Sequence, residues 1–421
     1  MSGSFGNVGF ISTRIAGNDG VSLEIGKWAE VLERNGYKCY YFAGTSDRPK
    51  NRCMLAKEAN FDHPKIKMIR KECFGKRRRP PRITRLIEDL KDNIKRKIYQ
   101  FIKKFDVDLI IPENALSLPM NIPLGLALTD FIAETGFPTI AHHHDFYWER
   151  SRFLVNCVDD YLDWAFPPSL PSIVHVAINS LASEELSHRK GISNVVIPNV
   201  YNFASPPPSP DYHCRDLRRR IGLGENDLFI LQPTRVIPRK CIERSIELVY
   251  RMRLRNPLLV ISQTTCDEGS SYYENIKEYA ESLGVRIVSI GNLIGPKRMK
   301  RKGGMIYTMG DVYQCADLVT YPSSYEGFGN AFLEAIYYKK PLVVNRYPIY
   351  ITDIEPKGFD LITIDSFVTK DAIEKIKEVI GDEKRREEMV EKNYRLALKY
   401  FSYEVLENSL KDIIERLHGV R

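Results

Sequence analysis

Short apolar runs alternate with amphipathic stretches along the chain. Residues 8–12 predict a buried strand, and apolar residues then recur at helical spacing, at Val21, Ile25, Trp28 and Leu32. Gly36 ends this helix, and residues 38–43 predict the next strand, which completes a βαβ unit. Ligands of open parallel sheets bind at the carboxyl ends of the strands. The loops that follow the strands are therefore the candidate sites.

The same alternation continues to about residue 200 and then starts again. Apolar runs predict strands at residues 107–111, 138–141, 172–178 and 195–199, and, in the second half, at 228–232, 258–262, 286–290, 317–320 and 341–345. Prolines concentrated at residues 206–210 favour a stiff linker between the halves. We therefore expect an α/β fold of two Rossmann-like, doubly wound parallel-sheet domains, residues 1–204 and 205–402. A final helix, residues 403–421, should return to the first domain.

Composition is that of an ordinary globular protein, with 43% hydrophobic and 28% charged residues among 421. The eight cysteines form no C-x-x-C pair, which favours reduced thiols. No signal peptide is recognisable, and prolines interrupt the most apolar stretch, residues 116–128. We expect a cytoplasmic protein, with attachment to the inner membrane face left open.

Positive charge is concentrated in one segment. Residues 65–104 carry sixteen Lys and Arg against four Asp and Glu, an excess of twelve, whereas the whole chain has a net charge of +8. The first half of the basic stretch, residues 61–81, predicts a loop. Its four successive cations, Lys76, Arg77, Arg78 and Arg79, precede two prolines and are expected to be exposed. This cluster can bind an anionic acceptor, a membrane surface or nothing, and a nucleic-acid-binding protein is the alternative of another class.

The chain's most distinctive stretch is residues 321–338, YPSSYEGFGNAFLEAIYY. It predicts a strand end, a glycine-rich loop and a helix that begins near Asn330. Backbone N–H groups of Phe328, Gly329 and Asn330 would then point out of a helix N-terminus, which suits an anion such as phosphate. Glu326 lies in the loop and Glu334 in the helix.

Two further strand ends carry candidate chemistry. Arg235 and Lys240 follow the strand at 228–232, and fixed cations there can stabilise a departing diphosphate. The strand at 138–141 ends in three adjacent histidines, residues 142–144. Because strand residues alternate faces, at most two of these rings point the same way, and zinc usually takes three or four ligands. We therefore predict no metal site.

The pattern E-G-F-G-x4-E-A resembles the donor signature of family 4, or group 1, glycosyltransferases. The phrases GNDGVSLE and HHHDFYWER are similar to the transferases that make small charged glycosides such as mannosylglucosylglycerate. The resemblance implies a GT-B fold, in which the two domains face each other across a cleft. It also implies a retaining hexosyltransferase that uses a nucleotide-diphospho-sugar of the GDP-mannose or UDP-glucose type. The acceptor would be a small, anionic molecule such as a phosphorylated or glycerate-containing sugar. The alternative is a peripheral membrane glycosyltransferase that acts on a lipid or polysaccharide.

The resemblance also assigns roles to individual residues. Catalytic roles fall to Glu326 and His144, which face the transferred sugar, and to Arg235 and Lys240, which hold the diphosphate. Glu334 would take the ribose hydroxyls, and the remaining donor contacts would come from Phe328, Gly329, Asn330 and Gly20. The acceptor residues would be Asn18, Asp19, His144, Asp145, Trp148 and Arg150. The family needs no cofactor, and we expect no essential divalent metal.

Overall fold

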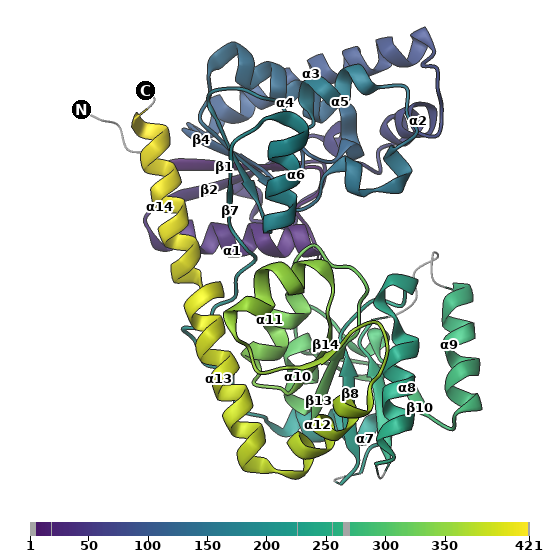
Figure 1. The fold of residues 1–421 in the computed structure, drawn as a ribbon. Coiled ribbons are helices and arrows are strands. Elements are labelled where there is room, and N and C mark those ends of the chain that lie inside the picture. The colour runs from purple at the N-terminus through teal and green to yellow at the C-terminus, as the bar shows by residue number, and fades with distance from the viewer. Residues whose placement is uncertain (1–5, 18, 225, 255, 264–269, 420–421) are drawn as a thin grey trace. The chain divides into compact units, whose positions relative to one another are not determined.

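A computed structural model of the chain describes residues 6–17, 19–224, 226–254, 256–263 and 270–419. It contains two compact units, each built on its own parallel sheet (Figure 1). The first unit comprises Met1–Val200 and Tyr403–Arg421, and the second comprises Tyr201–Ser402. The predicted α/β class with two doubly wound parallel sheets is confirmed.

The first unit holds a seven-stranded parallel sheet in the order β3-β2-β1-β4-β5-β6-β7. Its strands are β1 (Asn7–Ser12), β2 (Lys38–Ala43), β3 (Cys53–Leu55), β4 (Leu109–Pro112), β5 (Thr139–His143), β6 (Ile173–Ala177) and β7 (Asn194–Val196). The chain runs outward in one direction from β1 and then returns to begin the other half at β4. The carboxyl ends of β1 and β4 therefore flank a topological switch point, where ligands of such sheets bind.

Helices cover both faces of this sheet. One face packs against α1 (Gly20–Arg34) and α14 (Tyr403–Gly419), whose Trp28 and Leu410 lie in one core cluster (Figure 1). The other face packs against α3 (Pro81–Phe105) and α4 (Ile122–Thr135). The remaining helices of this unit are α2 (Pro64–Cys73), α5 (Asp159–Ala165) and α6 (Ser180–Lys190).

The second unit holds a six-stranded parallel sheet in the order β10-β9-β8-β13-β14-β15. The strands are β8 (Leu228–Gln232), β9 (Pro257–Ile261), β10 (Arg286–Ser289), β13 (Leu318–Tyr321), β14 (Leu342–Asn345) and β15 (Ile362–Ile364). Here the switch point lies between β8 and β13. A short hairpin, β11 (Met299–Arg301) with β12 (Gly304–Ile306), stands apart from this sheet.

One face of this sheet packs against α8 (Ile242–Met252), α9 (Ser270–Ser282) and α12 (Lys370–Gly381). The other helices are α7 (Tyr212–Arg220), α10 (Met309–Cys315), α11 (Asn330–Tyr337) and α13 (Glu383–Phe401). No helix in the described part of the chain is long and apolar enough to cross a membrane.

Two details differ from the expectations. The stretch before Pro81 contains the helix α2 where a loop was predicted, because Pro64 starts it and Ile66, Ile69 and Cys73 bury one face. The division between the units falls at Tyr201, and the expected boundary was at residue 205. The Tyr201 N–H donates to the Phe401 carbonyl, which ties this part of the connection to the second unit.

Candidate active site

The loops after β8 and β13 meet at the switch point of the second unit. Gln232, the last residue of β8, is fully buried and donates from Nε2 to the Lys240 carbonyl at 3.0 Å. On the other loop, the Ser324 N–H donates to the Arg239 carbonyl at 2.9 Å. These bonds hold the segment that carries Arg235, Arg239 and Lys240 against the segment that carries Glu326.

Glu326 is bound by two cations. Lys240 Nζ forms an ion pair with one carboxylate oxygen, and Arg239 Nη1 lies 3.1 Å from the other. Lys240 and Glu326 are each only 7% exposed, so this pair lies largely out of water. Arg239 also donates to the Tyr325 carbonyl at 3.0 Å. Arg239 was missed at the sequence level, although its place beside Lys240 was a signal that could have found it.

The protonation of these groups follows from burial and charge. Burial opposes ionisation of Glu326, but Lys240 and Arg239 outweigh it and hold the pKa of this carboxyl below its ordinary value. Burial also lowers the pKa of Lys240; Glu326 opposes this shift, whereas the nearby charges of Arg239 and Arg235 add to it. Two cations therefore pair with one carboxylate, and the charge of Arg235 also acts on Lys240, so the positive excess suits a diphosphate.

Gly329 shapes the loop before α11. Its φ is +120°, in a region that L side chains rarely adopt, and a Cβ atom there would lie 2.7 Å from the Tyr347 hydroxyl oxygen. The same hydroxyl donates to the Phe328 carbonyl at 2.8 Å. Gly329 is the N-cap residue of α11, and Asn330 is the helix's first residue. The three predicted anion-binding residues are thus brought together at a helix N-terminus.

Glu334 lies one turn into α11 and is half-buried. It is adjacent to the buried Tyr313 of α10; burial raises the pKa of this tyrosine well above its ordinary value, and Glu334 raises it further. Tyr338 stacks on Tyr313 with ring centroids 5.3 Å apart. The carboxylate is therefore held beside two tyrosines in the same unit as Lys240 and Glu326.

A second candidate site is a cavity of about 210 Å³ at the switch point of the first unit. The loop after β1 contributes Ser12, Thr13 and Arg14, and the residues after β4 contribute Glu113 and Asn114. Two of the predicted acceptor residues, Asp19 and Asp145, also line it. Asp19 caps α1 through the Ser22 N–H and pairs with Arg14 at 3.0 Å, whereas Asp145 pairs with Arg150.

The three histidines divide as strand alternation predicts. His143 faces His175, with Nε2 and Nδ1 2.9 Å apart, whereas His142 and His144 both lie near Glu113. Glu113 Oε2 is 2.9 Å from His142 Nδ1 and 3.0 Å from His144 Nε2. Burial opposes ionisation of Glu113, but His142 and then His144 outweigh it and hold the pKa of this carboxyl below its ordinary value. Burial also opposes the charge of His144, but Glu113 outweighs it and raises the pKa of this imidazole.

Glu113 is the third member of a group of possible metal ligands that the sequence did not predict. Glu113, His142 and His144 could offer a metal ion three ligand atoms, all within 4.8 Å of one another. Strand alternation alone predicts only that the two histidines lie on one face. The carboxylate comes from the neighbouring segment of the sheet, where Glu113 pairs with His142. The Asn114 side-chain oxygen accepts the N–H groups of His144 and Asp145, which fixes their place.

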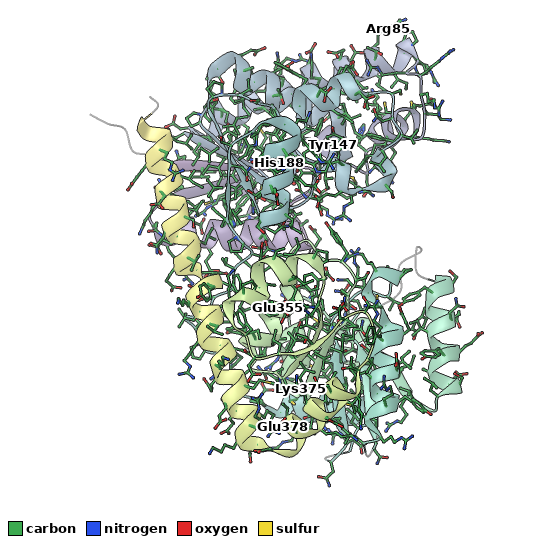
Figure 2. The ribbon with its side chains drawn as sticks, in the orientation of Figure 1. Arg85, Tyr147, His188, Glu355, Lys375 and Glu378 are labelled. Atoms are coloured by element: carbon green, nitrogen blue, oxygen red, sulfur yellow. The ribbon has the colours of Figure 1, made fainter. Side chains whose placement is uncertain are left out.

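The other predicted residues lie in varied surroundings. Trp148 stacks on Phe146 at 4.5 Å between ring centroids and lies under Arg189, and it is not part of the cavity wall. Its neighbour Tyr147 is labelled in Figure 2. Gly20 is the first residue of α1. Asn18 lies outside the described residues.

Arg79 corrects the prediction of an exposed four-cation cluster. Its guanidinium binds both oxygens of Asp160, at 2.8 and 2.7 Å, and lies over the Tyr161 ring. Lys76, Arg77 and Arg78 are exposed, as predicted, in the loop between α2 and α3. Arg79 therefore belongs to the packing of this unit, and three cations remain at the surface of the loop.

A larger cavity, of about 570 Å³, opens at the opposite, amino ends of the strands in the second unit. Its cations have protein partners: Arg218 pairs with Asp317, and Lys339 pairs with Glu391. Because ligands of parallel sheets bind at the carboxyl ends, we place the donor site at the loops after β8 and β13 despite the size of this cavity.

Comparisons with known proteins give the family. Residues 215–396 match the family described as glycosyl transferases group 1. The mannosylglucosylglycerate synthase of Thermotoga maritima is 32% identical over 93% of this chain and 96% of its own length. That of Petrotoga mobilis is 32% identical over 85% and 86%. The chain belongs to the group 1 glycosyltransferases. The predicted family and enzyme class are confirmed.

Several solved structures share the fold at low sequence identity. A glycosyltransferase from Rickettsia africae has a TM-score of 0.69 at 14% identity and covers 98% of both chains. Sucrose-phosphate synthase from Thermosynechococcus elongatus has a TM-score of 0.68 at 14% identity, covering 99% of this chain and 100% of its own. Anabaena HepE, solved with UDP and glucose, has a TM-score of 0.66 at 13% identity, covering 97% and 99%. The predicted GT-B fold is confirmed.

Proposed function

We propose that this glycosyltransferase moves a hexosyl group from a nucleoside-diphosphate sugar of the GDP-mannose or UDP-glucose type to a small anionic acceptor, with retention of configuration. The observation that carries the proposal is the 32% identity with mannosylglucosylglycerate synthase over 93% of the chain. The product named there contains mannosyl, glucosyl and glycerate groups. A mannosyl donor with a glucosylglycerate acceptor is therefore the first pair to test.

The donor diphosphate binds at the loops after β8 and β13. Arg235, Lys240 and the N-terminus of α11 offset the charge that grows on the leaving diphosphate, and interactions that strengthen in the transition state raise the rate. Lys240 is paired with Glu326. A phosphate that reaches Lys240 releases Glu326 toward the sugar ring, where its charge favours the positive anomeric carbon.

The transfer exchanges one bond at the anomeric carbon for another. The bond from this carbon to the diphosphate oxygen breaks, and a bond to the acceptor oxygen forms on the same face. The acceptor's proton passes to the departing phosphate oxygen. In the first unit, Glu113 holds the His144 ring at 3.0 Å. We propose that neither step requires a cofactor or a divalent metal.

A transfer assay tests this proposal. Purified protein is incubated with GDP-mannose or UDP-glucose and with glucosylglycerate, and products are identified by mass spectrometry. We expect a new product heavier than the acceptor by one hexosyl unit, and we expect EDTA to leave its rate unchanged. Nucleotide release without a glycosylated product, for either donor, would contradict the proposal.

A further inference from the structure

Two arginines from separate parts of the first unit converge on one sulfur atom. Arg70 Nη1, from α2, lies 3.9 Å from the Met120 Sδ, and Arg152 Nη2, from the segment after β5, lies 3.2 Å from it. Arg70 also lies over the Phe61 ring, as does Arg14. The guanidinium groups of these arginines therefore contact two apolar side chains, Phe61 and Met120.

The approach of these two cations has an electrostatic cost. Arg70 is half-buried and has no ion pair within 4.0 Å among the residues that the structure describes. Burial and then repulsion from Arg152 lower the pKa of Arg70, and the more distant Asp62 only partly offsets them. Two arginines that contact the same sulfur atom, one of them half-buried, create a positive charge density that suits an anion.

The two arginines adjoin the 210 Å³ cavity at the switch point between β1 and β4. Met120, Phe61 and Arg152 line it, together with Glu113 and Asp145. The cavity is thus cationic at one side and rich in hydrogen-bond acceptors at the other. It is below the ~300–1,000 Å³ of sites for drug-sized ligands, which favours a small molecule.

We infer that Arg70 and Arg152 together bind the acid group of the acceptor, a carboxylate such as that of a glycerate moiety, in this cavity. Met120 contacts both guanidiniums, and its flexible thioether moves aside when an oxygen pair enters. Arginine suits this task because its planar donors match a carboxylate in pairs. The acceptor's hydroxyl groups then lie toward Asp145 and Glu113. This inference rests on the proposed function.

Variants that keep the side-chain stem test the assignment. Arg70→Met and Arg152→Met remove the charge but retain apolar packing. Each is compared with the parent protein on glucosylglycerate and on its neutral counterpart, glucosylglycerol. We expect the KM for glucosylglycerate to rise about tenfold or more in each variant, because a charge-assisted hydrogen bond is lost. The KM for glucosylglycerol and for the donor should stay within about twofold, so that the preference for the acid disappears.

Arg85→Met is the matched control, because Arg85 is an exposed arginine on α3 of the same unit (Figure 2). It should leave the preference unchanged. Folding is checked by the melting temperature, and by the increase in it that GDP produces in the parent protein and both variants. D-glycerate alone should raise the melting temperature of the parent protein and of Arg85→Met, but not that of the two test variants.

The outcomes separate the inference from the function on which it rests. If the parent protein glycosylates both acceptors, and folded Arg70→Met and Arg152→Met keep its preference for the acid, the inference is overturned and the proposed function stands. If the parent protein glycosylates neither acceptor, the proposed function fails, and the inference fails with it. Loss of the preference in the exposed-site variant Arg152→Met alone, with normal melting, supports the inference even if Arg70→Met does not fold.

Discussion

At the scale of single residues, the ion pair between Lys240 and Glu326 links the two halves of the donor site. Each partner reduces the cost of burying the other, and Arg239 supplies a second positive charge to Glu326. Removal of Lys240 should therefore have two effects: the proposed phosphate contact is lost, and a buried carboxylate keeps only one cation.

Lys240→Ala and Arg235→Ala should lower kcat/KM by about 10² to 10³-fold, since a lost electrostatic contact costs roughly 2–4 kcal/mol in the transition state. Steady-state kinetics and calorimetry with GDP measure the effects. Lys240→Ala should also melt earlier, whereas Arg235→Ala should not, because Arg235 is exposed. Arg251→Ala, on the neighbouring helix α8, is the control. Near-parental rates in both test variants would remove the phosphate assignment.

The contact between Glu113 and His144 predicts a pH dependence of stability. Glu113 has a lowered pKa, so its contribution is present above its unfolded pKa of about 4.3 and is lost as pH falls through the folded value. His144 has a raised pKa, so its contribution is full below about pH 6.5 and is lost as pH rises through the folded value. The pair should stabilise the first unit most between about pH 4.5 and 6.5.

Melting temperatures of the parent protein and His144→Gln, measured from pH 4.5 to 9, test this dependence. The difference between the two proteins should be largest near pH 5–6 and should shrink as pH rises, because the imidazole loses its proton in the parent protein. A difference that stays constant with pH would show that the ring acts only through its packing.

At the scale of elements, the turn at Gly329 is the feature that brings the β13 loop and α11 into one anion site. Gly329→Ala should place a Cβ against the Tyr347 hydroxyl and force a side chain into a strained backbone. Such strain costs roughly 1–3 kcal/mol. We therefore expect lower thermal stability and weaker GDP binding, measured by calorimetry.

The control variant Gly358→Ala separates the effect of backbone strain from the effect of the close contact with Tyr347. Gly358 also has a positive φ, of +81°, but open space surrounds the position of its missing Cβ. It should lose some stability through the backbone alone and bind GDP normally. If Gly329→Ala binds GDP as well as Gly358→Ala does, the close contact with Tyr347 is not what shapes the site.

The elements themselves were largely predictable because apolar periodicity is strong in buried parallel strands. Strands β2 and β8 begin and end at the expected residues. The helix α2 was missed because Lys and Arg outnumber its buried Ile66 and Ile69, and a basic stretch after a proline resembles a loop. At the site, single residues such as Lys240 were found from their motif. Partners that come from a different strand, such as Glu113, depend on sheet order, which one sequence does not reveal.

At the scale of the whole molecule, the basic segment accounts for the net positive charge, but only some of its cations are exposed at the surface. We expect Lys76→Ser/Arg77→Ser/Arg78→Ser to raise the KM for an anionic acceptor modestly and to flatten its salt dependence, because exposed charges act over a Debye length of about 10 Å at 0.1 M salt. Kinetics from 20 to 500 mM NaCl measure this. Arg79→Ala should instead lower the melting temperature, since Arg79 is tied to Asp160.

Vesicle flotation tests whether this loop binds a membrane surface or a soluble acceptor. Retention on anionic vesicles by the parent protein, and its loss in the triple variant, would indicate a membrane surface instead of a soluble acceptor, at about 1 kcal/mol per removed cation. If neither vesicle binding nor acceptor kinetics changes, the three residues are only a solvated loop.

The most direct test of the central claim is one NMR experiment on the complete reaction. GDP-mannose, glucosylglycerate and the protein are followed together, with ³¹P signals reporting GDP and ¹H signals reporting the anomeric proton of the product. The account predicts equal amounts of GDP and mannosylated product, with the α configuration of the donor kept. GDP that accumulates without a glycosylated product, or a product with the β configuration, would contradict it.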